Sequence, residues 1–343
     1  MSGRSSLIAP LRKFDLADIS VLRYVCGATL AMAIALGVGW NLSHLLPVLA
    51  IGYFAPGAKP PTFKQGLMFL FTVIVSSFAA LLFFKIAGEY IMAFIPGFAL
   101  ILLTIFHTNK LAPQNKLFVL VSFLLVPMLG FISLKVAYAV VFSIITGAIV
   151  TLILVWIVHA IIPDVTMPGK AAPAKPAPKP LSSDERLAHA LNSLTVVLPL
   201  VLVFYFFQWS GGLLVLIFVA ILSMNPAFNI KAGMALILGN LAGGIISIIL
   251  YEMLVIVPQF FFLILLILLT GLFLGPKFFS GTKTAPLFGM AFSTVLLIIA
   301  QATSGTDDAG EKVWIRVLQI MIAVIYVVLA FSIMNYFRQR RLA

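Results

Sequence analysis

The basic residues of this chain collect in alternate gaps between long apolar runs, and no other feature constrains its fold as strongly. If the chain starts in the cytoplasm and crosses a bilayer at each apolar run, 18 of its 22 Lys and Arg face the cytoplasm. The basic residues left outside are Lys85, Lys135, Lys312 and Arg316, and the ten acids divide evenly between the two sides. This bias is what the positive-inside rule predicts for a correct topology.

The composition excludes a soluble domain. Hydrophobic residues make up 62% and charged residues 9% of the 343 positions, whereas soluble domains average roughly 45 to 50% and about 25%. The Lys and Arg stand singly or in pairs at the ends of apolar runs, where lipid headgroups account for them. The lipid bilayer is therefore the expected partner, and nucleic acid is not expected.

The apolar runs predict an all-α polytopic membrane protein with about 12 transmembrane helices and both termini cytoplasmic. A spanning helix needs roughly 20 residues. The first six spans are expected at 20–40, 42–56, 63–88, 90–107, 116–133 and 134–162. The other six are expected at 187–209, 211–225, 231–251, 253–274, 285–303 and 314–337.

The remaining segments divide the chain into five parts. Residues 1–19 are expected to form a cytoplasmic interfacial segment that leads into the first span. Residues 163–186 form a cytoplasmic linker rich in Pro, Ala and Lys, which is too short and too polar to be a folded domain. Residues 338–343 form a basic cytoplasmic tail. The membrane units are then 20–162 and 187–337.

These two units predict an internal repeat, because a series of residues recurs in the same order in both. Two six-span copies enter the membrane from the same side, so the repeat would be parallel, with an axis along the membrane normal. The recurring features are Trp40 and Trp209, Pro56 and Pro226, Lys64-Gln65-Gly66 and Lys231-Ala232-Gly233, Glu89 and Glu252, Pro96-Gly97-Phe98 and Pro258-Gln259-Phe260, and Lys110-Leu111-Ala112-Pro113 and Lys283-Thr284-Ala285-Pro286.

The sequence carries no signature of catalysis. It lacks a metal-ligand cluster, a phosphate-binding loop and a nucleophile motif, and its four His are scattered along the chain. We expect neither an enzyme nor a cofactor or metal.

Two unusually short spans, 42–56 and 211–225, occupy the same place in each unit. At 1.5 Å per residue each reaches only about 22 Å, less than the roughly 30 Å hydrocarbon core. Short or interrupted spans at matching repeat positions point to a transporter's substrate path, with Pro47 interrupting the first and Gly211-Gly212 opening the second. The alternative is that both helices simply match a thin bilayer. The residues assigned to the path here are Asn41, His44, Pro47, Tyr53, Gln208, Ser223 and Asn225.

Charged residues at the span ends suggest two further roles. Lys64 and Lys231 open the third span of each unit and could gather anionic substrates, or they could only anchor helix ends to headgroups. Glu89 and Glu252 stand at the outer ends of those spans, where a partly desolvated carboxylate could carry a proton. The alternative is that they are solvated interfacial acids, with Lys85 as a partner of Glu89. Arg316, near the start of the last span, is assigned to the same coupling group as a partner for Glu252 or Asp308.

Neutral polar residues replace charge in the middle of the spans, at Asn240, Gln259 and Gln319. Asn240 is included in the substrate path. It lies in the sequence GNLAGG, whose glycines permit close helix approach, so a packing role competes with a functional one.

Several of these residues carry a resemblance to a known family. Leu22-Arg23 opens the first span, Leu46-Pro47-Val48 breaks the second, Pro56 follows it, and Lys64-Gln65-Gly66 leads the third. In these features the chain resembles the fusaric acid resistance and aromatic acid exporter superfamily, in a short form without soluble domains. The resemblance implies a bacterial inner-membrane component that exports aromatic or amphipathic acids beside a periplasmic adaptor of the membrane-fusion type.

The sequence therefore supports a secondary efflux transporter of small organic acids, coupled to protons. The competing class is a non-transporting membrane subunit or scaffold of an envelope complex. A permease of the major facilitator type shares the count of six plus six spans, but its acidic-basic signature is missing between Gly57 and Lys64. Homo-oligomerisation is left open.

Overall fold

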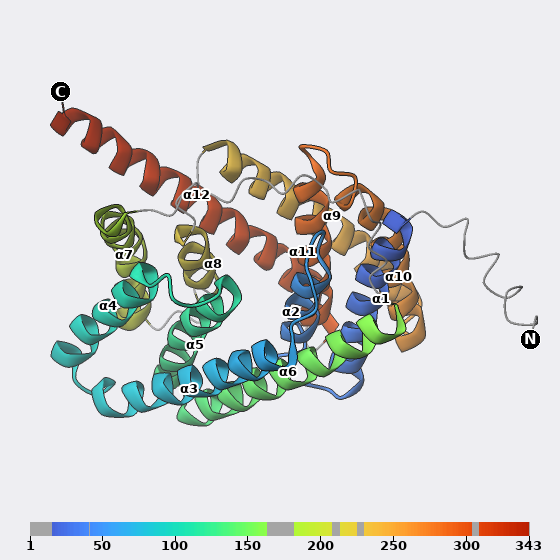
Figure 1. Cartoon of the computed structure of the whole chain (residues 1–343), viewed down its shortest axis with the longest axis horizontal. Helices are drawn as coiled ribbons and strands as arrows, with labels where there is room; N and C mark the ends of the chain where they lie inside the picture. Colours follow the sequence, from blue (N-terminus) through green and yellow to red (C-terminus); the bar gives the residue numbers. More distant parts are fainter. Residues whose placement is uncertain are drawn as a thin grey trace, which may run out of the picture.

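The computed structural model describes residues 16–40, 42–162, 182–207, 213–224, 230–303 and 309–342, and within these ranges the chain forms twelve helices and no strand (Figure 1). The first six helices are α1 (Leu16–Gly37), α2 (Leu45–Phe54), α3 (Phe63–Ala87), α4 (Ile91–His107), α5 (Pro113–Ile132) and α6 (Leu134–Ile161). The other six are α7 (Ser183–Phe207), α8 (Leu213–Ser223), α9 (Ile230–Ile256), α10 (Phe260–Phe278), α11 (Ala285–Thr303) and α12 (Ala309–Leu342).

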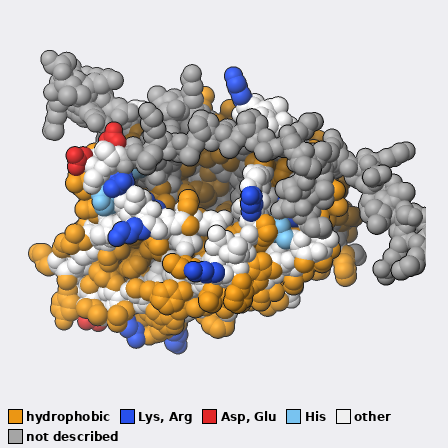
Figure 2. Space-filling model, viewed as in Figure 1, with side chains coloured by type: hydrophobic (Ala, Val, Ile, Leu, Met, Phe, Trp, Pro, Cys, Tyr) orange, Lys and Arg blue, Asp and Glu red, His pale blue; other side chains and the backbone are white. Residues whose placement is uncertain are grey.

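Eight of these helices are long and apolar enough to cross a membrane, namely α1, α3, α5, α6, α7, α9, α10 and α11. Shorter apolar helices are α2, α4 and the segment Leu318–Ile333 of α12. Hydrophobic side chains dominate the described surface in Figure 2, with Lys, Arg, Asp and Glu as isolated groups between them. The chain is therefore an all-α, multi-pass membrane protein.

Local signals set the starts of two helices that follow polar segments. Thr62 and Gln65 form a reciprocal capping box at α3, with the Gln65 N–H donating to Thr62 Oγ1 at 3.3 Å and the Thr62 N–H to Gln65 Oε1 at 2.9 Å. Ser182 and Glu185 make the same exchange at α7, at 3.2 and 2.8 Å. Each box satisfies backbone donors that have no partner inside the helix. The last residues of the predicted linker are therefore the first turn of α7, and 163–181 lie outside the described residues.

The predicted boundary between the ninth and tenth spans is wrong. The sequence analysis placed it at Glu252, but α9 continues through this residue to Ile256 and Pro258 lies in the break before α10. One carboxylate does not end a helix, whereas Pro lacks the N–H and disfavours helical geometry in the residue before it. Gln259 is consequently the exposed N-cap of α10, so its predicted mid-span position is also wrong.

Pro47 was expected to interrupt a helix, and this expectation is wrong. It is the third residue of α2, which begins at Leu45. The N–H groups of the first helical turn have no partner inside the helix, so the missing N–H of Pro47 removes no hydrogen bond. A turn over residues 42–44 precedes α2, and this turn is what makes the helix short.

The helix pairs that pack together follow a pattern with a period of six helices. Close pairs within α1–α6, such as α1 with α2 and α3 with α5, have counterparts in α7 with α8 and α9 with α11. Pairs between the halves obey the same rule, because α1 with α10 corresponds to α7 with α4, and α2 with α11 to α8 with α5. Figure 1 shows the result as two mixed groups, α4, α5, α7 and α8 on one side and α1, α2, α10 and α11 on the other.

Contacts at the helix ends agree with an alternating up-and-down course. Trp156 near the end of α6 donates from Nε1 to the Pro61 carbonyl oxygen at 2.9 Å, just before α3 begins. At the opposite ends of the same two helices, the Lys85 ammonium lies 5.3 Å from the centre of the Tyr138 ring. The first contact joins the end of α6 to the start of α3, and the second joins the end of α3 to the start of α6. In an alternating course, the two ends in each contact lie on the same side of the membrane.

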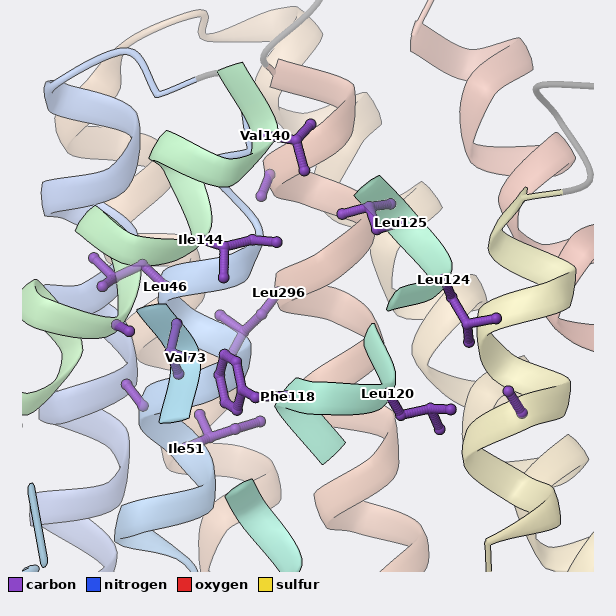
Figure 3. Packing of buried hydrophobic residues seen from close by; sticks show 14 of the residues in the cluster. Leu46, Ile51, Val73, Phe118, Leu120, Leu124, Leu125, Val140, Ile144 and Leu296 are labelled. Carbon is purple, nitrogen blue, oxygen red and sulfur yellow. The ribbon is translucent and has the colours of Figure 1, made fainter. Parts of the chain in front are cut away.

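One continuous apolar core joins the halves. Figure 3 shows Ile51 of α2 near Leu296 of α11 and Phe118 of α5, with Leu46 of α2 and Leu120 of α5 farther out on opposite sides of this group. Leu46, Leu120 and Leu296 are completely buried. The short helix α2 is therefore packed between elements of both halves.

Glycines bring α9 and α11 close together. A Cβ atom at Gly243 would lie 2.5 Å from the Ala291 carbonyl oxygen and 2.7 Å from Thr294 Cβ. At Gly239 it would lie 3.0 Å from Met290 Cβ. The packing role expected for the GNLAGG sequence is confirmed, since only small residues allow two backbones to approach this closely.

Candidate functional site

The short helices α2 and α8 occupy matching places at the junction of the two halves. They have 10 and 11 residues, so they reach only about 15 and 17 Å at 1.5 Å per residue. Helix α2 packs against α11 of the other half, and α8 packs against α5. Helix α2 is therefore shorter than expected, α8 has 11 residues within the described part of its expected span, and each packs against the other half.

The predicted path residues of the first half are mostly packed against neighbouring helices. Pro47 and Tyr53 are buried, and the Tyr53 ring meets the edge of Phe69 with centroids 6.3 Å apart. His44 is half-buried at the start of α2, and its neighbour Ser43 donates from Oγ to the Ala300 carbonyl oxygen of α11 at 3.2 Å. Asn41 lies outside the described residues.

In the second half, the end of α8 is held by side chains of α7. The Ser193 hydroxyl donates to the Ser223 carbonyl oxygen at 2.7 Å, and His189 Nε2 lies 3.3 Å from the Met224 carbonyl oxygen. The buried Ser223 hydroxyl itself donates to Val219 O at 2.7 Å. These contacts satisfy terminal carbonyls that a helix leaves without partners. Gln208 and Asn225 lie outside the described residues.

Lys116 extends this polar cluster to the first half. Its ammonium group donates to the carbonyl oxygens of Phe106 and Thr108, at 2.9 and 3.0 Å, where α4 ends. We call the cluster of Lys116, His189, Ser193 and Ser223 the basic junction. It lies where α4 and α8 end and where α5 and α7 begin.

Sequence reasoning missed the basic junction, although it used Lys116 as a topology marker. The available signal was the position of Lys116 three residues after Pro113, which opens α5. Lys116 therefore lies in the first turn of α5 and not in the loop between α4 and α5. Nothing local in the sequence shows that the first turn of α7 lies beside it.

The corresponding place on the other side of the molecule is filled by rings. The ring of Tyr24 lies 5.4 Å from Phe278, 5.6 Å from Phe279 and 5.6 Å from Phe292, from centroid to centroid. We call these four residues the aromatic junction. Counting from Pro113 and Pro286, Lys116 corresponds to Gly289, where a Cβ atom would lie 2.5 Å from the Phe278 ring.

Polar side chains also meet inside the membrane region, between the third and fifth helices of each half. In α9 and α11, the Thr294 hydroxyl donates to Asn240 Oδ1 at 2.6 Å. In α3 and α5, the hydroxyl oxygens of Ser77 and Ser122 lie 3.3 Å apart, and all of these groups are buried or part-buried. Asn240 is thus tied to α11, and each pair satisfies polar groups that lipid cannot.

The predicted charged residues whose side chains the structure describes do not converge on one site. Lys64, Glu89 and Glu252 are all exposed, and no ion pair joins Glu89 to Lys85 among the described side chains. Lys231 and Arg316 lie on α9 and α12, but their side chains are outside the described part. Gln319 is buried in α12.

Within the ranges that the structure describes, no group of three or more His, Cys, Asp or Glu side chains could hold a metal ion. Comparison with known proteins adds no assignment, since no protein-family model, curated protein or solved structure matches the chain.

Proposed function

We propose that the chain is a secondary transporter of the bacterial inner membrane that exports small aromatic or amphipathic organic acids. It has twelve spans in two parallel six-helix repeats, with both termini cytoplasmic, and it works with a periplasmic adaptor. The observation that carries the proposal is the matched pair of short helices α2 and α8, each packed against the opposite half.

The physical reason lies in what a short helix leaves behind. Two helices of about 15 and 17 Å cover only half of a roughly 30 Å hydrocarbon core. The backbone beyond them must then be buried in protein or line a water-filled path, because lipid offers no hydrogen bonds. A pair of such helices at matching positions is how secondary transporters place a substrate site between their repeats.

The repeat itself is supported by the pairing of the helices. Pairs that pack together in the first half recur six helices later, and so do the pairs between the halves. This is the contact pattern of two copies related by a twofold axis. It agrees with the recurring residues in the sequence, of which Lys110 to Pro113 and Lys283 to Pro286 are the longest.

The roles of individual residues belong to the same proposal. The path follows α2 and α8 and passes Asn240, while Lys64 and Lys231 gather acids at the cytoplasmic mouth. Glu89 and Glu252 couple export to protons, with Arg316 beside them. Both acids are exposed in the structure.

The test is export of benzoate and 4-hydroxybenzoate from cells that lack the gene and carry a plasmid copy. We expect the original sequence to raise the initial export rate and the tolerance of the cells. Replacing Lys64 and Lys231 together by Ala should lower that rate at least tenfold, and Glu89→Gln with Glu252→Gln should remove its dependence on the proton gradient.

The matched control replaces Lys59 and Lys283, two exposed lysines expected on the same side, and should leave export unchanged. Membrane insertion is checked for each variant by its amount in the membrane fraction. If the original sequence, produced with its adaptor, changes neither export nor tolerance, the chain is a non-transporting subunit and the proposal fails.

A further inference from the structure

We propose that the end of α10 is a binding site for an anionic phospholipid, whose phosphate group pairs with Lys277 and whose acyl chain follows an exposed ridge of α10. The inference goes beyond the proposed function and does not depend on export. Lys277 lies in the last turn of α10, directly after a long apolar run, so it stands at the level of the lipid headgroups. Among the described helices, α10 lies at the outer edge of the group that contains α1, α2 and α11 (Figure 1).

Two aromatic rings hold the ammonium group of Lys277 in place. Its Nζ atom lies over the ring of Phe273 on α10, 4.1 Å from the ring centre, and 5.3 Å from the centre of the Phe288 ring on α11. The face of an aromatic ring attracts a cation, so these contacts fix a long side chain at the edge between two helices. A ring carries no full charge, and the positive charge of Lys277 is therefore left for an anion.

No acid competes for Lys277 in this part of the chain. Residues 253–306 contain no Asp or Glu, and no ion pair joins Lys277 to any side chain that the structure describes. Gly275 faces α1, because a Cβ atom there would lie 3.0 Å from Val21. Lys277 follows two residues later, about 200° further around the helix. Its side chain therefore starts on the face of α10 that is turned away from α1.

The ridge that continues from Lys277 is open to lipid. Phe273, Leu269 and Leu265 follow it at steps of four residues and are 61, 63 and 58% exposed. Side chains four residues apart form a continuous oblique ridge on a helix. From Lys277 to Leu265 the rise is about 18 Å, enough for one leaflet of a hydrocarbon core of roughly 30 Å. A phospholipid therefore meets charge at its headgroup and exposed hydrocarbon along its acyl chain.

The connection between α10 and α11 shows which headgroup fits. Ser280 Oγ donates to the Lys277 carbonyl oxygen at 2.7 Å, and hydroxyl contacts of 2.9 and 3.2 Å link Ser280 to Thr282 and Thr282 to Thr284. Since a hydroxyl has one hydrogen, Thr282 donates to Ser280 and Thr284 to Thr282, which leaves acceptor positions open. Phosphatidylglycerol offers a phosphate and two hydroxyl donors. A zwitterionic headgroup would instead bring a second cation beside Lys277.

The experiment uses phosphatidylglycerol with a diazirine in its acyl chain, added to the purified full-length protein in detergent. After illumination, mass spectrometry locates the labelled residues. We expect labels within 265–273, removed by unlabelled phosphatidylglycerol but not by phosphatidylcholine with the same chains. Lys277→Gln should lower this labelling at least fivefold. Lys277→Arg should keep most of it, because a guanidinium keeps the charge and also stacks on a ring.

Lys283→Gln is the matched control. Lys283 is an exposed lysine of the same connection, and its replacement changes the net charge equally, but no ring contact holds it in the described structure. This variant should keep at least half of the labelling. Phe273→Leu retains an apolar side chain without the ring and should give an intermediate loss. Thermal unfolding checks that each variant is folded, and phosphatidylglycerol should raise the melting temperature of the original protein, since it binds the native state.

Four results would overturn the site. Two are unchanged labelling in folded Lys277→Gln and an equal loss in Lys277→Gln and Lys283→Gln, because the second would mean general attraction to positive charge. A third is labelling spread evenly over the exposed helices. The fourth is competition by glycerol 3-phosphate as strong as by the lipid, which would indicate a site for a free phosphate. Failure of the proposed function is distinct, since it appears as absence of export from cells.

Discussion

The basic junction and the aromatic junction occupy corresponding places in the molecule but are built from opposite chemistry. One gathers a lysine, a histidine and two serines around the end of α8, and the other packs four aromatic rings around the start of α1. Helices α1 and α11 of the aromatic junction correspond to α7 and α5 of the basic junction, with an offset of six helices, but α2 supplies no ring whereas its counterpart α8 supplies Ser223. Pairing of the helices therefore does not determine which side chains fill the space between them.

The difference shows how one arrangement can serve two purposes. Tyr24 and Phe292 are almost completely buried, so the aromatic junction holds its helices together by packing. The basic junction leaves a donor of Lys116 and one nitrogen of His189 without protein partners in the described part of the chain. The aromatic junction therefore holds its helices by ring packing, whereas the basic junction holds the ends of α4 and α8 by hydrogen bonds.

Removing a ring from the aromatic junction should have the largest effect on stability. Phe292 is completely buried, and Phe to Ala in a core costs about 3 to 5 kcal/mol. We expect Phe292→Ala to lower the free energy of unfolding by this amount in detergent, measured by denaturant titration. Phe261→Ala is the control, because that ring is 84% exposed. A loss below about 1 kcal/mol would contradict the packing role of the junction.

Exchanging the chemistry of the junctions should have an intermediate effect. Gly289→Lys places a lysine at the position that corresponds to Lys116, where the Phe278 ring leaves no room for a Cβ atom. Overpacking of this kind costs about 1 to 3 kcal/mol. The variant should melt at a lower temperature and gain no affinity for benzoate, whereas Gly147→Ala, with nothing within 4 Å, should melt normally. New benzoate binding in Gly289→Lys would show that the rings do not exclude a ligand.

The mid-membrane polar pairs should show the smallest effect, and the same one in both halves. Double-mutant cycles with Asn240→Leu and Thr294→Val, and with Ser77→Ala and Ser122→Ala, should give coupling energies of about 0.6 kcal/mol each. The measurement is the free energy of unfolding of the single and double variants. A coupling above about 2 kcal/mol in one half alone would indicate a role beyond helix packing.

Most of the helices could be predicted because their signals are local. The span at 285–303 agrees with α11 to the residue, and that at 134–162 differs from α6 by one. The predicted span boundary at Glu252 is wrong because it was based on the charge of that residue, whereas Pro258 is the residue that prevents a helix from continuing. Pro47 was misread for a related reason, since its effect depends on where the helix begins.

The candidate site was much less predictable than the helices. The short helices α2 and α8 were expected, but the basic junction was not, because Lys116 and the first turn of α7 are separated in the sequence by the whole of α6 and the linker. A residue near one span end gives no sign of which other span end will face it. Only the packing of α5 with α7 and α8 brings these helices together.

The sequence by itself determined that this is a helical membrane protein, since long apolar runs must satisfy their own backbone groups within a single helix. The tertiary structure decided which helix ends meet. In lipid one apolar helix face is much like another, so partners are selected by small residues, as at Gly243 against Ala291, and by a few polar contacts. These selections join the halves, and they bring together helix ends that are far apart in the sequence.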